Sequence, residues 1–111
     1  MAELDGALEA VERILNRGGD ADDVLRAVLL ALHARGIEYA AIRFVENDTL
    51  VEGPSVGERT AARRVAVTYD GERVGELELT TNDEQFARRL ATLISAYVLV
   101  GWDTGGAAWA P

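Results

Sequence analysis

Histidine, cysteine and lysine, which often carry enzyme chemistry, are almost absent from this chain. His33 is the single histidine, and there is no cysteine and no lysine among the 111 residues. A cysteine nucleophile, a Schiff base and a zinc site built on thiolates therefore have no residues to form them. His33 lies near the end of a predicted helix, where an imidazole commonly contacts the last carbonyls, and we interpret it as structural.

Two groups of carboxylates could do chemistry if the fold closed around them. Asp20, Asp22 and Asp23 could bind a hard cation, but they lack the glycine and final glutamate of a calcium loop, and we interpret them as helix-starting residues. Glu76 and Glu78 alternate along a predicted strand and could form an acid–base pair in a closed cleft. On an open sheet face we expect both to be solvated. We therefore predict no catalytic residues, no metal site and no cofactor.

The composition is typical of one folded domain with an acidic surface. Apolar residues make up 49% of the chain, and its 11 basic residues, all arginines, leave a net charge of −8. Such a chain repels nucleic acid and anionic lipid over most of its surface, so we expect neither nucleic acid nor a membrane as a partner. The acidic N-terminal segment is unlike a signal peptide, and apolar runs such as 96–100 are too short to span a bilayer. These features, with the lack of cysteine, favour a cytoplasmic protein.

The hydrophobic pattern predicts helices at both ends of the chain. Over 3–17 the apolar residues recur at helical spacing and make one stripe, formed by Leu4, Leu8, Val11 and Leu15. Asp20 is expected to cap a second helix that ends at Gly36. A last helix is expected up to Trp102, begun by a capping box of Thr81 and Glu84.

Between these helices the period changes to that of strands. We expect strands over 39–45, 49–52, 63–69 and 73–80, with Gly53-Pro54 ending the second and a bulge at Gly75 in the fourth. Asp70-Gly71 is a strong signal for a hairpin turn. The pattern predicts an α+β domain over 1–102, an antiparallel sheet of about four strands with two N-terminal helices and one C-terminal helix, followed by a flexible tail over 103–111.

Parts of this pattern resemble the GAF domain family. The hairpin 65–77, with its Asp70-Gly71 turn and a Val-Gly-x-Leu strand, looks like the late hairpin of that family. Segment 83–97 resembles its closing helix, and segment 36–42 its entry into the first strand. The resemblance covers roughly residues 3 to 101 and implies a GAF-like fold, which hosts many unrelated functions. A roadblock- or longin-like scaffold is the structural alternative, and the two leading helices favour the GAF reading.

The chain also departs from what the resemblance would imply for a ligand-binding member. Such domains usually insert helices and a further strand before the late hairpin, whereas only Gly53 to Ala62 joins the strands here. The usual pocket is therefore expected to be small, open or absent. The family's cyclic-nucleotide signature begins with Asn-Lys, and its bilin attachment and methionine sulfoxide reductase activity need cysteine, so this chain cannot support them.

These observations predict a non-catalytic GAF-like regulatory module that acts by homodimerisation or by binding a protein partner through its terminal helices. In the family the first and last helices commonly pack against their symmetry mates, and the apolar end of the last helix agrees with that role. By resemblance we assign the dimer interface to Leu4, Leu8, Val11, Leu15, Leu93, Tyr97 and Val100.

A small-molecule sensor is the alternative. An apolar or mixed ligand could bind between the sheet and the helices, in a site formed by Ile42, Phe44, Val67, Tyr69 and Leu77. An enzyme built on carboxylates alone is a third class, for which the sequence offers little.

Overall fold

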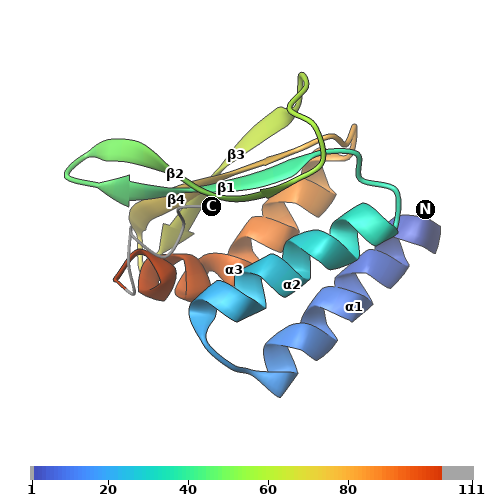
Figure 1. The fold of residues 1–111 in the computed structure, drawn as a ribbon, viewed down its shortest axis with the longest axis horizontal. Helices are drawn as coiled ribbons and strands as arrows, with labels where there is room; N and C mark the ends of the chain where they lie inside the picture. Colours follow the sequence, from blue (N-terminus) through green and yellow to red (C-terminus); the bar gives the residue numbers. More distant parts are fainter. Residues whose placement is uncertain (1, 104–111) are drawn as a thin grey trace.

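Two helices cover one face of a four-stranded antiparallel sheet, and a third packs against both of them on the side away from the sheet (Figure 1). The computed structural model describes the backbone of residues 2–103 and the side chains of residues 6–100. The elements, in chain order, are α1 (Ala2–Arg17), α2 (Ala21–Ala34), β1 (Ala40–Glu46), β2 (Thr49–Val56), β3 (Arg63–Tyr69), β4 (Glu72–Leu79) and α3 (Glu84–Asp103). The predicted α+β class and the order of its elements are confirmed.

The sheet has the strand order β2-β1-β4-β3. The β1–β2 hairpin and the β3–β4 hairpin therefore lie side by side, and β1 pairs with β4 between them. Both hairpin turns, Asn47-Asp48 and Asp70-Gly71, have positive φ at their two central residues, as a tight antiparallel turn requires. Segment 57–62 then carries the chain from β2, at one edge, to β3, at the other. Gly57 begins this crossover with φ +84°, and a side chain there would overlap the Glu38 carbonyl.

The core lies between the sheet and the helices. Alternation along β1 directs Ile42 and Phe44 toward α2 and α3, and Leu77 of β4 points to the same side. These side chains are completely buried, together with Leu25, Leu29, Leu90 and Ile94 from the helices. The fold therefore rests on one packed apolar layer, and it leaves the other face of the sheet free for polar residues.

The second strand is longer than its sequence predicts. β2 continues through Gly53-Pro54 to Val56, so the expectation that these residues end the strand is wrong. The pairing with β1 is irregular at this point, since its register shifts between Ala41 and Arg43. Gly53 lies so close to Phe44 that a side chain would overlap its ring. Because β2 is an edge strand, the missing N–H of Pro54 is tolerated there.

The ends of the helices differ from the prediction in detail. α3 is capped by Asp83, whose Oδ1 accepts a 3.0 Å hydrogen bond from the Phe86 N–H, so the capping box of Thr81 and Glu84 is wrong. Asp20 has the predicted N-cap position of α2, although its side chain makes no capping bond. α3 ends at Asp103, and the rest of the predicted tail lies outside the described residues. Within the described part of the chain, no helix is both long enough and apolar enough to cross a membrane.

Candidate functional site

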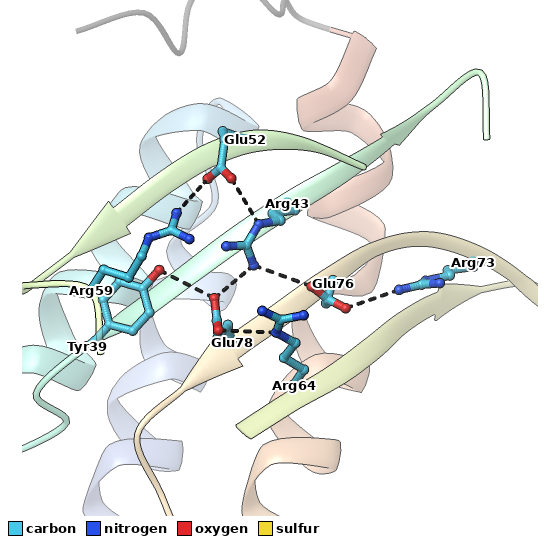
Figure 2. Close-up of polar contacts among 8 residues, drawn as sticks. All are labelled: Tyr39, Arg43, Glu52, Arg59, Arg64, Arg73, Glu76 and Glu78. Carbon is cyan, nitrogen blue, oxygen red and sulfur yellow. Dashed lines mark hydrogen bonds and ion pairs between the residues drawn. The ribbon is translucent and has the colours of Figure 1, made fainter. Parts of the chain in front are cut away.

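The face of the sheet that the helices leave uncovered carries a connected group of charged side chains. We call it the arginine–glutamate cluster, and Figure 2 shows its members: Tyr39, Arg43, Glu52, Arg59, Arg64, Arg73, Glu76 and Glu78. The alternation that turns Ile42 and Phe44 toward the helices turns Arg43 the other way. All four strands or their adjoining segments contribute to this face, so the cluster crosses the whole width of the sheet.

Arg43 is the centre of the cluster. Its Nη1 lies 2.8 Å from Oε1 of Glu78 and 3.4 Å from Oε1 of Glu76, and its Nε lies 3.1 Å from Oε2 of Glu52. Strand register explains this geometry, because Arg43 pairs directly with Glu52 on β2 and with Glu76 on β4. The Arg43 side chain is only 9% exposed, so its charge depends on these carboxylates rather than on water.

A second ring of arginines surrounds the buried centre. Arg64 donates to Glu78 over 3.3 Å and Arg73 to Glu76 over 3.2 Å, while Arg59 donates to Glu52 over 3.4 Å. These three guanidinium side chains are at least half exposed. The Tyr39 hydroxyl also donates to Glu78, over 3.4 Å. The cluster thus has a dry centre of one arginine and two glutamates with a hydrated cationic rim.

The electrostatics of the centre keep both partners ionised. Burial alone would raise the pKa of Glu78, but hydrogen bonds from Arg43 and Arg64 outweigh it and hold that pKa below its usual value. Burial likewise opposes the charge on Arg43, yet its hydrogen bonds to Glu78 and Glu52 raise its pKa. A general acid needs a pKa near the working pH. The pKa of Glu78 is lowered instead, so its carboxyl group is ionised near neutral pH and has no proton to donate.

The cluster corrects the sequence analysis at two residues. Glu76 and Glu78 do point to the outer face, but they are buried rather than solvated. Arg43 was missed as their partner, although its position between Ile42 and Phe44 fixed its face. The missing information was the pairing of β1 with β4, which joins residues more than thirty positions apart in the chain.

The structure places four of the five predicted ligand-binding residues inside the core. Ile42, Phe44, Val67 and Leu77 are completely buried between the sheet and the helices, and Tyr69 is 43% exposed at the end of β3. A ligand between these layers would have to displace packed side chains.

The predicted interface residues divide between the core and the surface. Val11 is completely buried, and Leu4 lies where only the backbone is described. Four others are partly buried at the edge of the core: Leu8, Leu15, Leu93 and Tyr97. Val100 is 47% exposed. The Tyr97 hydroxyl donates to the Leu15 carbonyl over 3.3 Å, which joins the C-terminal ends of α1 and α3.

The remaining candidates have ordinary structural roles. His33 Nδ1 lies 3.1 Å from the Ile37 carbonyl, just past the end of α2, in agreement with its structural interpretation. Asp20, Asp22 and Asp23 lie at the start of α2. Among the residues that the structure describes, no three His, Asp or Glu side chains are arranged to hold a metal ion.

Comparison with known proteins identifies the fold but not the function. No protein-family model and no curated protein matches the sequence. The structure is similar to the crystal structure of the GAF domain from Acinetobacter phosphoenolpyruvate-protein phosphotransferase, with a TM-score of 0.71 and 13% identity over 95% of this chain and 97% of that chain. The alignment spans nearly all of both chains, so the two domains are similar in extent. At this identity the likeness is evidence of fold alone. The chain has a GAF-like fold, as the resemblance in its sequence implies.

Proposed function

We propose that this chain is a non-catalytic regulatory module that pairs with a second copy of itself through α1 and α3. Alternatively, the same surface binds a different protein, as it would within a larger regulatory assembly. The fold supports a regulatory role in general terms, since GAF-like domains serve many regulators. The surface of the terminal helices supports the mode of action.

One observation carries the proposal. The hydrogen bond from Tyr97 to the Leu15 carbonyl brings α1 and α3 together near their C-terminal ends, where both helices carry apolar side chains that the core covers only in part. We call this surface the helix-end patch; it consists of Leu8, Leu15, Leu93, Tyr97 and Val100. On α3 its residues follow the spacing of one helical face. Val11 is excluded from it because that side chain is buried within the chain.

Apolar side chains that stay partly exposed on two neighbouring helices favour an interface. A second copy is the simplest occupant, because a two-fold pair buries the same patch on both chains. The arginine–glutamate cluster supports the non-catalytic part of the proposal, since the buried Glu78 carboxylate is held ionised in its pair with Arg43 and is not suited to donate a proton.

Substitution of Val100 by glutamate tests the patch. We expect the wild-type chain to be a dimer at tens of micromolar by size-exclusion chromatography with light scattering, and Val100→Glu to be a monomer. Tyr69→Glu is the matched control, because Tyr69 is similarly exposed but lies at the end of β3. A wild-type mass that is monomeric and unchanged by dilution would rule out self-pairing. Dissociation by both variants alike would argue against this patch.

The second candidate function is a small-molecule sensor. The predicted site between the sheet and the helices is filled by Ile42, Phe44, Val67 and Leu77, so a ligand there needs the core to open. A rise in melting temperature with an apolar metabolite would support the sensor over the interaction module.

A further inference from the structure

In the part of the chain that the structure describes, no strand lies beside the outer side of β3. β3 pairs with β4 and lies at one end of the strand order β2-β1-β4-β3. Every second residue of such an edge directs its N–H and C=O away from the sheet. These groups can pair with another extended chain, and that is the basis of peptide recognition by strand addition.

The two edges of the sheet differ in their ability to accept a strand. β2 contains Gly53 and Pro54, and proline lacks the N–H that a ladder needs. β3 has neither glycine nor proline over its seven residues. The edge at β3 is therefore the better template for an added strand.

A groove runs beside this better edge. It has a volume of about 390 Å³. Its lining comes from β3 and α3: Arg63, Arg64, Val65, Ala66 and Thr68 on the strand, and Glu84, Arg88, Ala91 and Thr92 on the helix. α3 packs under β3, so a strand added to β3 would lie over the N-terminal half of that helix (Figure 1). The residues toward the middle of the helix, Ala91 and Thr92, are small and leave room for side chains of the added strand.

The charge of the groove indicates what kind of strand it accepts. Three arginines and one glutamate line it: Arg63, Arg64, Arg88 and Glu84. Arg63 and Arg88 share Glu84 as ion-pair partner, and Arg64 pairs with Glu78 of the cluster. Arg64 and Arg88 are 64% and 69% exposed, so both remain accessible to a further carboxylate. This cationic groove lies on a chain whose net charge is −8, so it stands out as a site for an acidic segment.

We propose that β3 and α3 form a docking groove for an extended acidic segment of a partner protein, which adds to the sheet as a fifth strand beside β3. Backbone hydrogen bonds to β3 hold the segment. Carboxylates at alternate positions of the segment all point to one face of the added strand, the face toward α3, and there they meet Arg63 and Arg88. The groove and the helix-end patch share no residue of α3, so this proposal can be tested separately from self-pairing.

The test is an NMR titration of the ¹⁵N-labelled chain with a capped peptide of alternating glutamate and valine. We expect saturable shifts of amides in 63–69 and 84–92. The same peptide carrying N-methyl groups at alternate residues keeps its charge but loses its ladder donors, and we expect it not to bind. The corresponding lysine–valine peptide should not bind either, because like charges repel in the groove.

Charge reversal in the groove supplies the matched variants. We expect Arg88→Glu to weaken binding of the glutamate–valine peptide by about tenfold or more. Arg13→Glu makes the same change in net charge on the exposed surface of α1 and should leave the affinity unchanged. Equal binding of the N-methylated peptide, equal weakening by both variants, or shifts confined to residues outside β3 and α3 would overturn the proposal. So would an absence of saturable shifts.

Discussion

At the scale of single residues, Arg43 determines whether the outer face of the sheet can be closed to water. Glu76 and Glu78 are both buried, and each accepts a hydrogen bond from the same guanidinium. Removing a carboxylate from water is costly unless a cation and further donors replace the lost hydration. Arg64, Arg73 and Tyr39 supply those further donors. The cluster is therefore a unit in which the central cation matters most.

Replacing Arg43 with leucine is expected to destabilise the fold strongly. The substitution leaves two buried glutamates without their shared cation, and breaking a buried pair in this way costs about 3 to 5 kcal/mol. Urea unfolding followed by circular dichroism would measure the loss. Arg59→Leu is the control, because Arg59 is exposed and its ion pair should contribute less than about 1 kcal/mol. Similar small losses in both variants would show that the buried centre is not the critical part.

The lowered pKa of Glu78 predicts a dependence of stability on pH. Its pKa in the folded chain lies below the value of 4.5 expected when unfolded, so the unfolded state takes up the proton first as the pH falls. The contribution of Glu78 is thus complete above the unfolded pKa and is lost as the pH falls through the folded pKa.

Comparison with Glu78→Gln isolates this contribution from the other carboxylates. The free energy of unfolding of wild type minus that of Glu78→Gln should shrink as the pH falls below the unfolded pKa of 4.5 and then through the lower folded pKa. Urea titrations of both proteins at each pH would measure it. Parallel pH profiles for the two proteins would contradict the assigned role of the ion pair.

At the scale of elements, the sequence predicts helices and strands correctly where hydrophobic spacing and turn residues point to the same structure. The stripes of apolar residues and the Asp70-Gly71 turn predict three helices and four strands in the right order, and each is present. The prediction was wrong at Gly53-Pro54, because these residues usually interrupt strands, whereas an edge strand with an irregular register can contain them. It was also wrong at Thr81, because Asp83 competes for the same capping role and its side chain reaches the Phe86 N–H.

The outer-face cluster needed information that local patterns do not hold. Alternation showed that Glu76 and Glu78 point outward, but their burial depends on which strand lies next to β4. Arg43 is on β1, and the register of β1 against β4 is a tertiary feature. The same limit applies to Val11, whose position in an apolar stripe did not show that it is covered within its own chain.

Replacing either of two glycines with alanine should change the stability of the domain, in opposite directions at the two positions. Gly53→Ala should destabilise the domain by about 1 to 3 kcal/mol, because the new methyl group overlaps the Phe44 ring and the Ile42 carbonyl and β2 must move. Gly6→Ala should stabilise it by up to about 1 kcal/mol, because alanine favours the helix and the nearby Arg35 side chain can turn away. Thermal unfolding of both variants would show the difference, and equal shifts would contradict the close packing of β2 on β1.

At the scale of the whole molecule, the charges and the apolar surface are separated. The chain carries a net charge of −8, yet arginines are concentrated on the outer face of the sheet and in the groove beside β3. The helix-end patch is apolar. Salt weakens attraction between opposite charges and also weakens repulsion between like charges, so it should act on the two proposed surfaces in opposite directions.

Raising the ionic strength from about 50 to 500 mM should strengthen self-pairing through the helix-end patch, because two acidic chains then repel each other less. The same change should weaken the binding of the glutamate–valine peptide, because its carboxylates are attracted to Arg63 and Arg88. Sedimentation equilibrium would give the dimer dissociation constant, and the NMR titration would give that of the peptide. If salt dissociated the dimer, ion pairs rather than apolar contacts would hold the two copies together, and the arginine-rich groove would become the better candidate for that interface.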